Sequence, residues 1–124
     1  MLINLSNHSS TKWPAGQKQA AYPYGNIVDM PFPAINTQAS TNAIVQLAKD
    51  YAKTVTKKLS KDDDILNAVH LMGEMTFSFA LVSLLQKQGV ACIASTTQRM
   101  VEEQEGQKLV KFSFVRFREY PEIY

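Results

Sequence analysis

The strongest constraint on the fold of this chain is an apolar run near its middle. Residues Ile65 to Met72 are nearly all apolar, and they do not alternate with polar residues. This pattern is typical of a parallel strand covered on both faces, whereas a strand with one wet face alternates apolar and polar positions. The run therefore predicts a central strand of a parallel sheet.

The segments on either side of this run predict the other elements of an α/β domain. Further strands are expected at residues 2–6, 27–30 and 90–94, the last extending over 97–103 into a hairpin that turns near 104–107 and returns over 108–117. Helices are expected between Pro14 and Pro23, from Ser40 or Thr41 to about Leu59, and over 77–88. In the return strand the apolar positions change from even to odd near Phe114, which predicts a bulge there.

This order of elements predicts one domain over residues 1–124, with a small Rossmann-like fold. We expect a three-layer α/β/α sandwich around a mostly parallel five-stranded sheet, with strand order 2-1-3-4-5 and an antiparallel C-terminal edge strand. The length of 124 residues and the 45% hydrophobic content suit a single domain with its own core.

Composition excludes several classes of function. The net charge of +2 is too small for a generic duplex-DNA binder or a polybasic membrane anchor. No apolar run approaches the roughly 18 residues of a membrane span, and the first residues do not resemble a signal peptide, so we expect a cytoplasmic protein. The one cysteine, Cys92, lies in an apolar run and is expected to be a buried thiol. We expect neither a metal nor a cofactor, because no set of ligands has metal-binding spacing.

Three polar segments follow predicted strands and form the candidate site, since ligands of such sheets bind beyond the carboxyl ends of the strands. After the first strand come Asn7, His8, Ser9, Ser10 and Lys12. After the central strand come Gly73, Glu74, Met75 and Thr76. After the fourth strand comes the segment Ser95–Arg99, in which Thr96, Thr97 and Arg99 are the candidate ligand contacts.

These segments suit an anionic ligand. His8 is a candidate general acid or phosphate donor, and the guanidinium of Arg99 offers bidentate phosphate contacts. The free amides of Gly73–Thr76 at a helix start would favour phosphate, with Glu74 more suited to stabilising that helix than to catalysis. The alternative is that these polar residues only cap loops and helices. His70, inside the apolar run, is expected to be a hydrogen-bonded core histidine.

The missing motifs narrow the chemistry further. The chain has no Walker A sequence, no G-x-G-x-x-G and no G-x-S-x-G. An ordinary ATPase, a dinucleotide dehydrogenase and a Ser-His-Asp hydrolase are therefore disfavoured.

The segments Leu2–His8, Val69–Thr76 and Ala94–Arg99 together resemble those of a small stand-alone CRISPR-associated Rossmann-fold (CARF-like) protein. The resemblance implies a homodimer in which two crevices hold a cyclic oligoadenylate second messenger of type III CRISPR antiviral signalling. Some such proteins cleave the ring and others only bind it. Ligand contacts are then expected at Asn7, His8, Ser9 and Gly73–Thr76. We expect no nuclease or DNA-binding domain beside this one, and we therefore expect the protein to bind or degrade the messenger rather than to signal onward.

Ring opening needs no metal if a ribose 2′-hydroxyl is held in line with the adjacent phosphorus and donors stabilise the developing charge. Arg99 and Lys12 could supply donors, but His8 is the one natural candidate for the general base, so cleavage and sequestration both remain open. A tetramer and a hexamer both contain the two-fold axis of a homodimer, whereas a three-fold ring does not. The short loops of a 124-residue chain offer a small platform, which favours the tetramer.

The helix over 77–88 is expected to build part of that dimer, since Met75, Phe79 and Val82 lie off its main apolar stripe. The alternatives to a messenger-binding dimer are a phosphosugar or mononucleotide enzyme and a non-catalytic interaction module.

Overall fold

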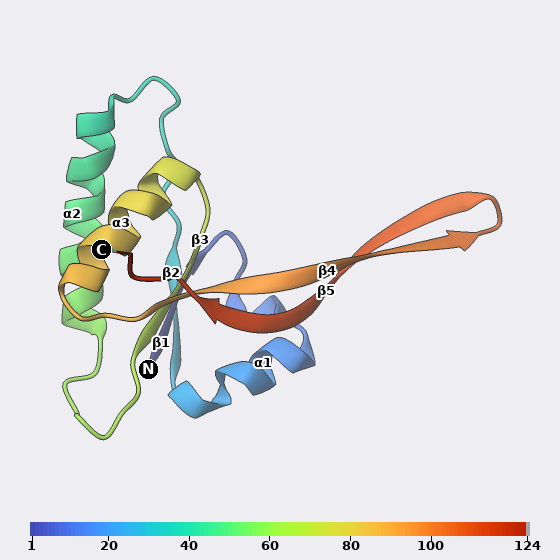
Figure 1. Ribbon diagram of the computed structural model, residues 1–124, viewed down its shortest axis with the longest axis horizontal. Coiled ribbons are helices and arrows are strands. Elements are labelled where there is room, and N and C mark those ends of the chain that lie inside the picture. Colours follow the sequence, from blue (N-terminus) through green and yellow to red (C-terminus); the bar gives the residue numbers. More distant parts are fainter. Residues whose placement is uncertain (124) are drawn as a thin grey trace.

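The structure is a computed structural model that describes residues 1–123. Within them, five strands form one sheet in the order β2-β1-β3-β4-β5, with β1 to β4 parallel and β5 antiparallel to β4. Helix α1 lies on one face of the sheet and helices α2 and α3 lie on the other (Figure 1). The predicted three-layer Rossmann-like fold and its strand order are confirmed.

The elements occupy nearly the residues that the sequence predicts. The strands are β1 Leu2–Ser6, β2 Ile27–Pro31, β3 Ala68–Met72, β4 Cys92–Gln104 and β5 Gln107–Glu119. The helices are α1 Ala15–Ala21, α2 Thr41–Lys58 and α3 Met75–Lys87, with single 3-10 turns at Ser10–Lys12 and Tyr22–Tyr24.

Helix α2 follows from its sequence period. Ser40 begins the helix as its N-cap, where its Oγ accepts a hydrogen bond from the amide of Ala43 at 3.1 Å. The buried side chains recur at three- and four-residue spacing along one face: Ile44, Ala48, Ala52 and Val55.

Strand β3 is shorter than predicted. The strand was expected from Ile65, but it begins at Ala68, and Ile65 and Leu66 are 42% and 56% exposed. The cause is a turn: the amide of Ile65 donates to the carbonyl of Asp62, and the amide of Asp64 donates to the carboxylate of Asp62. The backbone groups that would begin the strand are therefore used in the turn.

The sheet has a core on each face, which explains why its central strands are apolar throughout. One core combines alternate β1 and β3 side chains with α2 and α3, and it contains Ile3, Leu5, Val69, Leu71, Phe77, Leu81 and Leu85. The other lies under α1 and contains Leu2, Trp13, Ala21, Ala68 and Ile93. Cys92 is buried, as predicted.

Strands β4 and β5 continue beyond the sheet as a long two-stranded hairpin (Figure 1). The ladder pairs Thr96 with Arg116 but Thr97 with Phe114, so Val115 is the extra residue of a bulge, next to the predicted position. Past this bulge the hairpin leaves the body of the molecule, and its apolar residues are exposed: Met100, Val101, Leu109, Val110 and Phe112.

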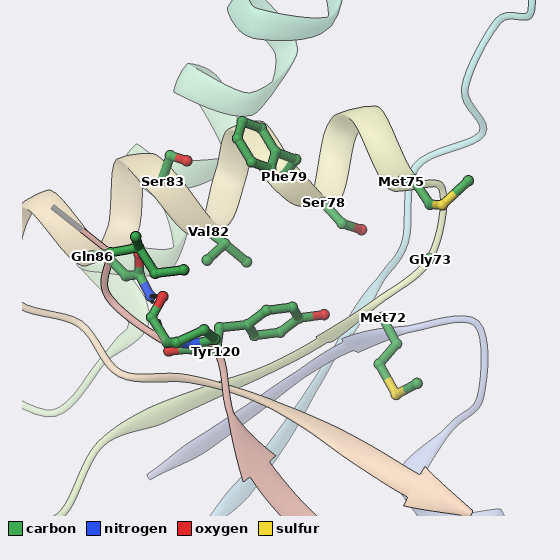
Figure 2. A pocket seen from close by; sticks show the side chains of 11 residues that line it. Met72, Gly73, Met75, Ser78, Phe79, Val82, Ser83, Gln86 and Tyr120 are labelled. Atoms are coloured by element: carbon green, nitrogen blue, oxygen red, sulfur yellow. Dashed lines mark hydrogen bonds between the residues drawn. The ribbon is translucent and has the colours of Figure 1, made fainter.

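Helix α3 corrects one expectation about a dimer surface. Val82 was expected to need cover from a second chain, but it is buried within the protomer and belongs to the core on which Tyr120 packs. Figure 2 shows Val82 facing Tyr120 across a cavity. Met75 and Phe79 are 83% and 77% exposed, so they remain free for a partner surface.

Candidate functional site

A crevice of about 560 Å³ lies at the carboxyl ends of β1 and β3, beside the base of the hairpin. Its polar wall contains Ser6, Asn7, His8, Lys12, Gln17, His70, Ser95 and Thr97. Its apolar wall contains Trp13, Pro14, Met72 and Phe112, with Gly73 at the edge. This is the location where a sheet of this topology is expected to bind a ligand.

The crevice brings together five of the twelve site residues that the sequence predicts. Asn7, His8 and Lys12 come from the segment after β1, Gly73 follows β3, and Thr97 lies in β4. Segments far apart in the chain therefore meet in one concave surface.

Ser9 and Ser10 have a different role in the structure. The Ser10 hydroxyl and amide donate to the carboxylate of Asp29 at 2.8 and 3.0 Å, and the Ser9 hydroxyl lies 2.9 Å from that of Thr11. Neither serine lines the crevice, and Ser9 lines a neighbouring depression that also contains Asp29. They hold the loop after β1 against β2.

Glu74 occupies the start of helix α3. Its carboxylate accepts hydrogen bonds from the amides of Thr76 and Phe77 at 3.0 and 2.8 Å and from the Thr76 hydroxyl. These bonds, led by that from the Thr76 hydroxyl, lower the pKa of Glu74. The helix amides that were expected to receive phosphate thus bind a side chain of the protein itself. Met75 lies at the start of α3 with its side chain directed away from Val82 and Tyr120 (Figure 2).

A second cavity, of about 600 Å³, lies between α3 and Tyr120 and is lined mainly by apolar side chains. It shares Met72 and Gly73 with the crevice, so the two cavities adjoin.

Thr96 and Arg99 lie on opposite faces of the hairpin. The Thr96 hydroxyl donates to the carbonyl of Arg116 across the ladder at 3.1 Å. Arg99 pairs with Phe112, and cross-strand partners share a face of a sheet. Since Phe112 lines the crevice, Arg99 lies on the crevice side of the hairpin, beyond its rim.

A polar network across three strands reaches the crevice at His70 and Ser95. The register places Asn4 of β1 between Asp29 of β2 and His70 of β3. The Nδ1 atom of His70 lies 2.9 Å from Asn4 Oδ1, and its Nε2 lies 2.7 Å from Ser95 Oγ. His70 is 2% exposed, so the prediction of a hydrogen-bonded core histidine is confirmed.

The partners of Asn4 determine where the protons of this network lie. Its Nδ2 donates at 2.8 Å both to Asp29 Oδ1 and to the carbonyl of His8, two groups that only accept. Asn4 therefore presents Oδ1 to His70, whose Nδ1 must carry a proton.

The far end of the network follows from the charge of His70. Burial lowers the pKa of His70 to about 4, so at neutral pH the ring is uncharged and its Nε2 is a bare acceptor. The Ser95 hydroxyl donates to it, while Gln17 Nε2 donates to Ser95 Oγ at 3.0 Å.

Aromatic rings and a carboxylate hold the network in place. The His70 ring lies edge-on to Trp13 at 5.2 Å and tilted against Phe117 at 5.5 Å. Burial raises the pKa of Asp29, but the hydrogen bonds from Asn4, Ser10 and Ser9 outweigh burial and leave the pKa below its ordinary value. Asp29 is thus a fixed negative charge behind Asn4.

Sequence reasoning missed Asn4 and Gln17 as members of this site, and it included Ser95 in the polar segment after the fourth strand without giving it a role. A signal existed for Asn4, which is a polar residue in the middle of an otherwise apolar strand. Ser95 lies beside the predicted Thr96 and Thr97, and Gln17 carries no comparable signal.

Residues 1–123 show neither a cluster of metal ligands nor a membrane-spanning helix. No group of three or more His, Cys, Asp or Glu side chains in this range is arranged to hold a metal ion. In the same range, no helix has both the length and the apolar character needed to cross a membrane.

Comparison with known families gives one match, which extends over residues 1–118. The matching family is described as the Uncharacterized protein MJ1673 family. The chain belongs to this family. Every residue that lines the crevice falls within residues 1–118, so the whole crevice lies in the part of the chain that matches the MJ1673 family. Searches of curated proteins and of solved structures found no match.

Proposed function

We propose that this MJ1673-family chain binds a cyclic oligoadenylate, the tetramer, across the two-fold axis of a homodimer in type III CRISPR antiviral signalling, and either cleaves or sequesters it. The observation that carries the proposal is the convergence of Asn7, His8, Lys12 and Thr97 in one crevice at the carboxyl edge of the sheet. The resemblance of three sequence segments to CARF-like proteins supplies the ligand class.

The walls of the crevice suit a nucleotide. Lys12 on the rim and Arg99 on the adjoining hairpin face provide positive charge for phosphates. Phe112 is 68% exposed and offers an aromatic surface on which an adenine can stack. The Asn7 amide supplies both a donor and an acceptor for a base edge.

The size of the crevice supports a shared ligand. Its volume of about 560 Å³ lies within the range of roughly 300–1,000 Å³ for small-molecule sites. A ring of four nucleotides would then be held by two crevices, each of which contacts one half through the same residues.

The surface beside the crevice supports a homodimer. Met75 and Phe79 expose two large apolar side chains on α3, close in sequence to Gly73 at the crevice edge. Exposed apolar groups of this kind mark interaction sites more often than isolated surface residues do.

A mononucleotide or phosphosugar enzyme is the second candidate. The observation that favours it is that the polar wall, including His70, Ser95 and Gln17, is complete within one chain. Such a ligand would bind once per chain, whereas a symmetric ring would bind once per two chains.

Isothermal titration calorimetry with cyclic tetra-adenylate tests the proposal, with cyclic hexa-adenylate and AMP titrated in parallel. We expect one ring per two chains. Arg99→Ala should weaken binding about 10- to 150-fold, the equivalent of one charge-assisted hydrogen bond. Arg116→Ala is the matched control, because Arg116 pairs with Thr96 on the opposite face of the ribbon. If neither ring binds at tens of micromolar while the dimer stays intact, the proposal is overturned.

A further inference from the structure

We propose that Ser95 is the catalytic residue of the crevice and relays a proton from the ribose 2′-hydroxyl of the bound ring to His70. The inference rests on the proposed function. It supplies a general base other than His8, which is the one candidate that the sequence offers. It starts from the hydrogen bonds of the network, in which every proton between Asp29 and Ser95 has a determined position.

The network is arranged to accept a proton at its open end. Asn4 holds the His70 Nδ1 proton, so the Nε2 lone pair faces the Ser95 hydroxyl at 2.7 Å. In enzymes, a hydroxyl is activated when it donates a hydrogen bond to an imidazole and a third group orients that imidazole. Asn4 is the orienting group here, with Asp29 behind it as a second positioning residue.

Ser95 is the member of this pair that a ligand can reach. The His70 ring is 2% exposed, whereas Ser95 is only partly buried and lines the crevice. Gln17 Nε2 donates to Ser95 Oγ at 3.0 Å, which stabilises negative charge on that oxygen as the serine proton leaves.

The step balances without a metal or a redox partner. The ribose 2′-oxygen attacks the adjacent phosphorus while its proton passes to Ser95 Oγ and the serine proton passes to His70 Nε2. The bond from phosphorus to the 5′-oxygen breaks, and the 5′-oxygen takes a proton from solvent water. His70 then returns its proton to solvent, so no water is consumed overall. The products are a linear chain with a 2′,3′-cyclic phosphate and a 5′-hydroxyl.

The surroundings of His70 define its expected pH dependence. The groups packed on its ring are Asn4, Ser95, Trp13 and Phe117, none of which carries a charge. The titratable groups nearby are His8 and Lys12 in the crevice and Asp29 behind Asn4. A neutral His70 is the active form, and burial keeps it neutral down to about pH 4 in the free protein. The cleavage rate should therefore stay level from about pH 8 to about pH 5 and fall only below that.

The experiment measures cleavage of cyclic tetra-adenylate by chromatography and its binding by calorimetry, on the same dimeric protein. Ser95→Ala should slow cleavage at least about 100-fold with binding within about threefold of wild type. His70→Gln should do the same where circular dichroism shows it folded. Ser95→Thr, which keeps a hydroxyl, should restore part of the rate. Ser113→Ala, on the hairpin face away from the crevice, is the control and should cleave normally.

The outcomes separate this inference from the proposed function. A wild-type protein that binds the ring and does not cleave it overturns the relay and leaves the binding function standing, whereas a protein that does not bind the ring overturns the function itself. Cleavage by Ser95→Ala near the wild-type rate would also overturn the relay. So would cleavage of a ring that lacks its 2′-hydroxyls.

Discussion

The buried imidazole of His70 makes the stability of the fold depend on pH in one direction. Burial lowers its pKa in the folded protein from 6.5 to about 4, whereas the unfolded chain exposes an ordinary imidazole. Between these two values the unfolded state binds a proton that the folded state does not, so the free energy of unfolding falls as the pH falls. Above pH 6.5 both states are neutral at this residue, and its effect vanishes.

The size of the effect follows from that pKa difference. Each pKa unit is worth about 1.4 kcal/mol, so the loss reaches about 3 kcal/mol below pH 4 and about 2 kcal/mol between about pH 7.5 and pH 5.0. A comparison of about pH 7.5 with pH 5.0 measures mainly the contribution of histidine to stability, because carboxyl groups titrate mainly below pH 5. Asp29, with its lowered pKa, destabilises the fold only when the pH falls further.

Urea unfolding followed by circular dichroism at the two pH values measures this difference. We expect wild type and His8→Gln to lose about 2 kcal/mol, because His8 is exposed and lies outside the core. His70→Gln should lose little, since it has no buried imidazole to protonate. A loss in His70→Gln equal to that of wild type would refute the assignment of this pH dependence to His70.

Three further predictions concern the scaffold. Ser40→Ala removes the N-cap of α2 and should lower the free energy of unfolding by about 1 kcal/mol in urea titrations, whereas Ser40→Gly should cost only a few tenths. Gly73→Ala should cost about 1–3 kcal/mol, because its Cβ would overlap the ring of Phe32. Gly16→Ala in α1 should be neutral or stabilising, because its Cβ would lie 3.9 Å from the Phe114 ring, an ordinary van der Waals contact; equal effects of the two variants in thermal melts would contradict this. Burial raises the pKa of Cys92 to about 12, so the native thiol should not react with a disulfide reagent at about pH 8 until urea unfolds the chain.

Local patterns were sufficient to predict most of the fold. The period of α2 and the unbroken apolar strands arise from burial on one helix face and on both sheet faces, which neighbouring residues reveal directly. The start of β3 was wrong because the turn at Asp62 uses backbone groups that an apolar pattern cannot report. Val82 was misassigned because Tyr120, far along the chain, extends the core on that side of α3.

The candidate site was predictable only in outline. Strand exits can be located from sequence, so the meeting of His8, Gly73 and Thr97 could be anticipated. The network of Asn4 with Asp29 and His70 depends on the register of three strands, and a difference of one residue would turn these side chains to the other face. The contacts among its members are therefore visible only in the folded chain.

Native mass spectrometry of the protein with cyclic tetra-adenylate measures how many chains and rings form the complex, because it weighs the protein and its ligand together. We expect a complex of two chains with one ring, depleted in Arg99→Ala and retained in Arg116→Ala. In Ser95→Ala the ring should remain intact in that complex. Complexes of one chain with one mononucleotide, or a dimer that carries no ring at any ratio, would contradict this expectation.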